Sequence, residues 1–134
     1  LGLVIDERKA DFERDDFLVR AVLGADHARR AVAVDAEVEV GATIQFQVRD
    51  AASADEDLRD LLADAPGGAA LVFTCTGRGT ALFPYPHHDA AVIHQHLDGG
   101  AVAGMFSAGE IGPIGHRHFV HAMSASALLF DDLF

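Results

Sequence analysis

The sequence predicts a mixed α+β (α/β) fold with a largely antiparallel sheet, one parallel βαβ unit and two or more covering helices. Three observations predict this class. Apolar and polar residues alternate from residue 32 to 48, which is typical of a half-buried antiparallel sheet. Apolar residues recur at helical spacing from 53 to 65. Apolar runs at 69–75 and 101–106 flank a second helical stretch, which is the order of a βαβ unit.

The start of the chain holds two short apolar runs, residues 1–5 and 17–23, on either side of a highly charged loop. Both runs read as strands. The alternating segment 32–48 is longer than a usual strand. We therefore expect it to form a hairpin, or two strands, with the break near Gly41.

The first helix is predicted over residues 53–65. Ser53 and Glu56 have the spacing of a capping box, in which each side chain satisfies a free backbone N–H group of the other residue. Leucines follow at helical spacing, and the turn that begins at Pro66 ends the helix.

The βαβ unit should contain the central strand of the sheet. Residues 69–75 are apolar without polar alternation, which predicts a strand covered on both faces. A short helix follows, capped by His88 or Asp89 and ended by Gly99. Residues 101–106 are a second buried strand, and a third is predicted over residues 122–130 after a glycine-proline loop.

Two loops should meet at one edge of this sheet. A βαβ crossover makes its two strands parallel, so their carboxyl ends lie on the same edge. We therefore expect residues 74–79 and 107–115 to lie close together, at the edge where open α/β sheets bind ligands.

Arg78 and Glu110 are rare charges in an apolar half of the chain, and each lies in a glycine-rich turn. A buried ion needs a partner, because an unpaired one is costly. Arg78 offers a planar fork to a ligand carboxylate or phosphate, or else pairs with Glu110. Glu110 could instead pair an ammonium group, act as a general base or brace its loop. Gly112 and Pro113 either only turn the chain or direct backbone N–H groups at an anion.

Cys75 reads most simply as a small buried apolar residue. An enzyme would use it as a nucleophile, with His121 or Glu110 as the base. Histidines are dense in the second half of the chain: His87, His88, His94, His96, His116, His118 and His121. No cysteine or carboxylate completes a recognisable ligand set with them, so we expect no metal and no cofactor.

Composition limits the partners and the compartment. A net charge of −11 argues against nucleic acid and membrane partners, because both require clustered Lys and Arg. No apolar stretch reaches the ~20 residues of a membrane helix. The single cysteine excludes an internal disulfide, so we expect a cytoplasmic protein. The 134 residues suit one domain, and the missing initial Met suggests the carboxyl-terminal part of a longer protein.

Two motifs carry a resemblance to a known family. They are Phe73-Thr-Cys-Thr-Gly-Arg-Gly79 and Ala103-Gly-Met-Phe-Ser-Ala-Gly-Glu-Ile-Gly-Pro113, supported by the segments 1–5, 16–20 and 41–50. With them, nearly the whole chain resembles the carboxyl-terminal domain of the FIST family, the F-box and intracellular signal transduction proteins. The family usually continues with a His-Asn-x-Thr segment, of which His121-Ala-Met-Ser124 keeps the histidine and lacks the Asn.

The resemblance implies a sensory domain over residues 1–134 that follows a FIST amino-terminal domain, its expected partner. It implies binding of a small ligand such as an amino acid, whose carboxylate Arg78 would hold and whose ammonium Glu110 would hold. A protein-interaction module, as in F-box relatives, is the alternative, with the Gly-Pro loop and Tyr85 as the docking region. The resemblance transfers no catalytic residue. The predicted ligand site comprises Cys75, Arg78, Gly79, Ser107, Glu110, Gly112, Pro113 and His121.

Overall fold

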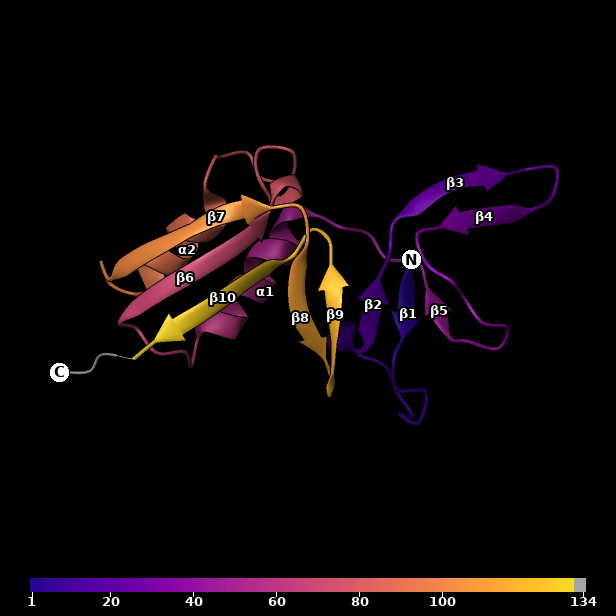
Figure 1. Cartoon of the computed structure of the whole chain (residues 1–134), viewed down its shortest axis with the longest axis horizontal. Coiled ribbons are helices and arrows are strands. Elements are labelled where there is room, and N and C mark those ends of the chain that lie inside the picture. Colours follow the sequence, from indigo (N-terminus) through magenta and orange to yellow (C-terminus); the bar gives the residue numbers. More distant parts are fainter. Residues whose placement is uncertain (132–134) are drawn as a thin grey trace. The chain divides into compact units, whose positions relative to one another are not determined.

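A computed structural model of the chain describes residues 1–131 (Figure 1). The chain divides into two compact units. Unit 1 contains Leu1–Val48 and Gly112–His121, and unit 2 contains Arg49–Ile111 and residues 122–131. Within the described residues, antiparallel sheets, one mixed sheet with a parallel pair and two α-helices confirm the predicted α+β class.

Unit 1 is built from short strands. A three-stranded antiparallel sheet has the order β2-β1-β5, and β3 forms a hairpin with β4. The bounds are β1 Gly2–Val4, β2 Phe17–Val19, β3 Val22–Asp26, β4 Ala31–Val34 and β5 Ile44–Gln45, with a short 3-10 helix at Arg14–Asp16.

Of the two forms expected for residues 32–48, the hairpin is wrong and the two separate strands are confirmed. The chain does break at Gly41, whose φ is 99°, but β4 and β5 belong to different sheets. The turn that ends at Arg30, with φ 53°, folds β4 back onto β3, so β5 is left to pair with β1. The alternation therefore spans two separate strands, which periodicity alone cannot distinguish from one hairpin.

Unit 2 contains the predicted βαβ unit. The strands β6 Ala69–Cys75 and β7 Ala101–Ser107 are parallel, and β10 Ala125–Phe130 runs antiparallel to β6. The sheet order β10-β6-β7 makes β6 central, as predicted. The helices are α1 Ala51–Leu62 and α2 His88–His96, and a short 3-10 helix at Thr76–Arg78 follows β6. Neither α-helix of the described part is long and apolar enough to cross a membrane.

Both helices pack on one face of the β10-β6-β7 sheet, as Figure 1 shows. The core of unit 2 consists of Leu58, Leu62, Ala70, Val72, Val92, Ile93 and Leu97. The register places Leu71 and Phe73 on the opposite face with residues of β7 and β10, where they are 38% and 40% exposed. The prediction that β6 is covered on both faces, and that β7 is a buried strand, is therefore wrong for the described chain.

The helix caps differ from those predicted. Asp50, not Ser53, is the N-cap of α1, because its carboxylate accepts hydrogen bonds from the Ser53 N–H (2.9 Å) and hydroxyl (2.8 Å). The N-cap of α2 is His87, in a left-handed conformation with φ 59°, whereas Asp89 lies in the first turn. Gly99 has a φ of 92°, in agreement with the predicted end of this segment.

The predicted glycine-proline loop contains a hairpin that the sequence analysis missed. Its strands are β8 Glu110–Ile114 and β9 Arg117–His121, joined by a turn with Gly115 at φ 57°. Pro113 is compatible with β8 because, among the described strands, β8 pairs on one side only, with β9. Consequently β10 begins at Ala125 rather than at 122.

Candidate functional site

The centre of the candidate site is a buried ion pair between Arg78 and Asp89. Arg78 Nε donates to Asp89 Oδ2 at 2.8 Å, and Nη2 donates to Oδ1 at 2.9 Å. The two side chains are only 9% and 2% exposed. Paired, parallel bonds of this kind are among the strongest that proteins form. Glu110 was the expected internal partner of Arg78, and the structure shows that this partner is Asp89 instead.

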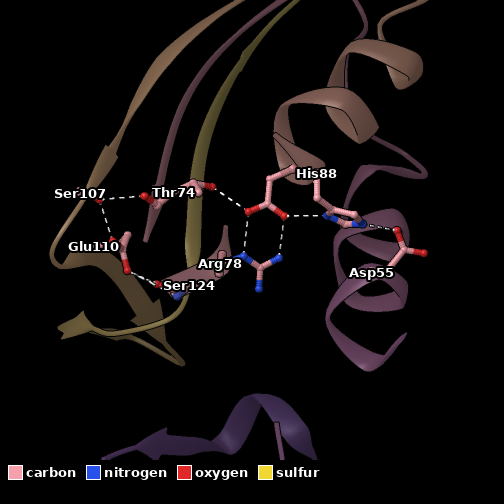
Figure 2. Close-up of polar contacts among 8 residues, drawn as sticks. Asp55, Thr74, Arg78, His88, Ser107, Glu110 and Ser124 are labelled. Carbon is pink, nitrogen blue, oxygen red and sulfur yellow. Dashed lines mark hydrogen bonds and ion pairs between the residues drawn. The ribbon is translucent and has the colours of Figure 1, made fainter. Parts of the chain in front are cut away.

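Asp89 also contacts Thr74 and His88 (Figure 2). Thr74, at the end of β6, donates its hydroxyl to Oδ2 at 2.8 Å, and His88 Nδ1 lies 3.1 Å from Oδ1. Burial raises the pKa of Asp89, but the hydrogen bonds from Arg78 and Thr74 outweigh burial, so the net pKa is lowered. The carboxylate is therefore ionised at neutral pH.

His88 continues the network into α1. Its Nε2 lies 2.9 Å from Asp55 Oδ1, so one imidazole bridges two carboxylates (Figure 2). The ring also stacks on Phe83, with centroids 3.6 Å apart and planes inclined by 6°. The pKa of Asp55 is lowered, mainly by its hydrogen bond from Arg59 and also by His88.

A cavity of about 350 Å³ adjoins the ion pair. Its polar lining is Thr74, Arg78, His87, His88 and Asp89, and its remaining lining is Val72, Ala90, Val102, Ala103, Gly104, Met105 and Phe106. A second cavity of about 390 Å³, lined by residues 76, 79–81 and 86, shares His87 and Phe106 with the first.

Gly104 allows the close approach of strands beside the first cavity. A Cβ atom there would lie 1.8 Å from the backbone oxygen of Val72 on β6. Any side chain would therefore push β7 away from β6, so the glycine of this motif has a packing role.

One edge of the Arg78 guanidinium is free. Nη1 donates to no acceptor in the described part of the chain, and no buried side-chain nitrogen or oxygen among residues 1–131 lacks a partner. Nη1 is therefore not sealed inside the protein. The guanidinium carbon also lies 5.3 Å from the centre of the Phe83 ring, which helps to fix the orientation of the group.

A second cation, Arg49, lies close enough to interact electrostatically with Arg78 and Cys75. Partial burial lowers the pKa of Arg49, and the like charge of Arg78 adds to this effect. Arg49 was not among the predicted site residues, because it lies 29 positions before Arg78 in the sequence.

Glu110 braces the loops at the ends of β7 and β10. Its Oε1 accepts a hydrogen bond from the Ser107 hydroxyl at 2.7 Å, and its Oε2 accepts from the hydroxyl (2.9 Å) and N–H (3.4 Å) of Ser124 (Figure 2). Glu110 is 3% exposed and lines neither cavity described above. Of the roles considered for it, loop bracing is the one that its contacts support.

The other predicted residues fall in different surroundings. Cys75 is a buried free thiol next to the 3-10 helix that carries Arg78, and Gly79 lines the second cavity. Gly112, Pro113 and His121 belong to unit 1, where His121 Nε2 lies 3.0 Å from the Gly112 oxygen. Residues 74–79 and 107–115 were expected to lie close together. Within unit 2 the Cys75–Ser107 register pair confirms this at the strand ends, whereas residues 112–115 belong to unit 1.

Among the described residues, no three histidine, cysteine or acidic side chains are grouped so that they could hold a metal ion. The residues that sequence reasoning missed are Thr74, His87, His88 and Asp89, together with the apolar wall on β7. One feature of the sequence could have indicated Asp89 as a site residue: it lies eleven residues after Arg78, in the first turn of the crossover helix.

Residues 1–113 match a family model described as FIST C domain. An uncharacterized protein of Mycobacterium bovis is 49% identical over 138 residues, and two uncharacterized proteins of Mycobacterium tuberculosis are 49% and 47% identical over the same length. Each alignment covers 98% of this chain and 36% of the relative, so the chain spans about a third of the length of these relatives. No solved structure is significantly similar to this chain.

Proposed function

We propose that this chain, which belongs to the FIST C domain family, is a cytoplasmic sensory domain of a signal-transduction protein that binds a small ligand beside the Arg78–Asp89 pair. The observation that carries the proposal is the free edge of a buried guanidinium next to a cavity of about 350 Å³. Ligand pockets of this size combine mostly apolar walls with a few fixed polar groups. An amino acid is the ligand that the family resemblance suggests.

The cost of the ion pair supports a role beyond folding. Removing two charges from water costs several kcal/mol per ion, and apolar residues of the same volume often stabilise a protein equally well. Because Arg78 and Asp89 also line the cavity, contacts with a ligand can offset part of this cost. Phe83 and Asp89 hold Arg78 in one orientation, which reduces the entropy lost on binding.

The hydrogen bonds of Asp89 and His88 connect Arg78 to both helices of unit 2. Arg78 follows β6, Asp89 lies in the first turn of α2, and Asp55 lies on α1. A ligand on Arg78 therefore contacts a group that is hydrogen-bonded, through Asp89 and His88, to both helices. We expect ligand binding to stabilise the packing of α1 and α2 on the sheet, and this is the change that a partner would detect.

A thermal-shift screen with small acids and amino acids tests the proposal. A ligand at 100 times its dissociation constant stabilises the folded chain by ~2.7 kcal/mol, which is several degrees in melting temperature. Phe106→Ala should reduce the shift, because Phe106 lines the cavity and is 45% exposed. Phe73→Ala is the matched control, because Phe73 is 40% exposed on the opposite face of the sheet. A screen without any stabilising compound would refute ligand sensing by this cavity.

A second function, docking of another domain, is favoured by the open sheet face. This face carries the exposed apolar residues Leu71, Phe73, Met105, Leu128 and Phe130. The relatives contain almost twice as many residues outside the matched region as within it. We therefore propose as occupant the FIST amino-terminal domain of a longer polypeptide, with an apolar surface that covers this face.

Cysteine labelling tests the docking surface. Leu128→Cys places a thiol on the open face, and Leu61→Cys, on α1 at 79% exposure, is the control. We expect a maleimide to label both variants rapidly in the chain alone, and to label Leu128→Cys slowly in the longer polypeptide. Equal labelling of both variants there would contradict the proposal, and concentration-dependent protection in the chain alone would indicate a second copy as the occupant instead.

A further inference from the structure

We infer that the cavity beside Arg78 selects a small carboxylic acid with an apolar body and no ammonium group. This inference rests on the proposed function and names the chemical class of its ligand. It follows from a count of the free donors and acceptors around the cavity. The ligand with two opposite charges that the sequence suggested needs a charged acceptor, and the site does not offer one.

The charged acceptor in the cavity is already saturated. Asp89 Oδ1 receives bonds from Arg78 Nη2 (2.9 Å) and His88 Nδ1 (3.1 Å), and Oδ2 receives bonds from Arg78 Nε and Thr74 Oγ1 (both 2.8 Å). A carboxylate has about four lone-pair sites, and all four are occupied. Among the described residues that line the two cavities, Asp89 is the only carboxylate.

Glu110 cannot replace Asp89 as the partner of an ammonium group. It receives three bonds from Ser107 and Ser124, is 3% exposed, and lines neither cavity. A ligand ammonium would therefore lie beside Arg78 and meet only neutral acceptors, such as backbone carbonyl groups. Burial of a charge without a charged partner is costly.

The donors, in contrast, are free. Arg78 Nη1 donates to no acceptor in the part of the chain that the structure describes, and neither does the exposed His87 ring that lines both cavities. Arg49 adds a second positive charge near Arg78. A ligand carboxylate would gain charge-assisted hydrogen bonds from Arg78, while Val72, Val102 and Phe106, which line the cavity, surround its apolar body.

Titration calorimetry on the chain with two matched ligand sets tests this selectivity. One set is 4-methylpentanoate, leucine and 3-methylbutylamine, and the other is 3-phenylpropanoate, phenylalanine and 2-phenylethylamine. Within each set the apolar body is shared and only the charged groups differ. We expect the acid to bind roughly 10- to 100-fold more tightly than the amino acid, since the ammonium group of the amino acid would lose its hydration without gaining a charged acceptor. The amine should not bind.

Each outcome has a distinct meaning. An amino acid that binds as tightly as its acid, or an amine that binds, would overturn the ligand class and leave ligand sensing intact. If neither set bound, the ligand class would be overturned for this cavity. If the broader thermal-shift screen were also negative, the proposed function would fail with it. Phe106→Ala should weaken acid binding and Phe73→Ala should not, and equal effects would overturn the assignment to this cavity.

Discussion

The substitution Asp89→Asn tests the central claim that Arg78 depends on one buried carboxylate. The change keeps the shape of the side chain and removes its charge. Asp89 accepts four bonds, two of them from Arg78, and both side chains of the pair are less than a tenth exposed, so solvent screening is small. Loss of one partner of such a pair costs roughly 3–5 kcal/mol, because the other charge stays buried without compensation.

Urea unfolding followed by circular dichroism measures this loss. With a denaturant slope of about 2 kcal/mol/M, the expected loss lowers the midpoint by roughly 2 M. Asp6→Asn is the control, because Asp6 pairs with Arg8 at the surface and its removal should leave the midpoint almost unchanged. A double substitution, Arg78→Met with Asp89→Leu, should recover most of the loss, since no charge is then left unpaired. A loss below ~1 kcal/mol for Asp89→Asn would refute the reasoning.

Three further predictions concern pH, the thiol and the glycine on β7. The pKa of Asp89 is lowered from 3.8 in the folded chain, so its stabilising effect is present above pH 3.8 and is lost as the pH falls through the folded pKa. The free energy of unfolding of Asp89→Asn should therefore be lower at neutral pH and should decrease less steeply below pH 4 than that of the unchanged chain. Iodoacetamide should alkylate Cys75, which is 6% exposed, only after unfolding, and rapid modification of the folded chain at neutral pH would instead support an enzyme. Gly104→Ala should destabilise the chain by several kcal/mol in urea unfolding, because the new Cβ would meet the Val72 oxygen. Gly67→Ala is the control and should destabilise the chain little, because no atom lies close to its new Cβ. Similar unfolding midpoints for the two variants would contradict the close approach of β6 and β7 at Gly104.

The sequence predicted that the carboxyl ends of β6 and β7 lie together because topology alone determines it. A βαβ crossover aligns the carboxyl ends of β6 and β7, and the register pair of Cys75 and Ser107 follows from this rule. The rule depends only on the order of the elements. It needs no knowledge of individual side-chain partners, so errors in the caps and strand ends did not affect it.

The partner of Arg78 could not be predicted in the same way. An aspartate in the first turn of a helix is usually explained by the helix dipole or by capping, and this explanation is sufficient from the sequence alone. Only the position of α2 beside the end of β6 reveals that Asp89 faces the guanidinium. Glu110 was attractive as a partner because it is a rare charge, and the sequence does not show that Ser107 and Ser124 already satisfy it.

The error about the faces of β6 carries information of its own. A strand with one face in water usually alternates apolar and polar residues, whereas a strand buried on both faces is apolar throughout. Residues 69–75 have the second pattern, yet only the face with Ala70 and Val72 is covered in the described chain. Leu71 and Phe73 would not stabilise a sheet that stays exposed to water, since such positions favour polar side chains. The sequence of β6 therefore supports, independently of the length of the relatives, the proposal that another domain covers this face.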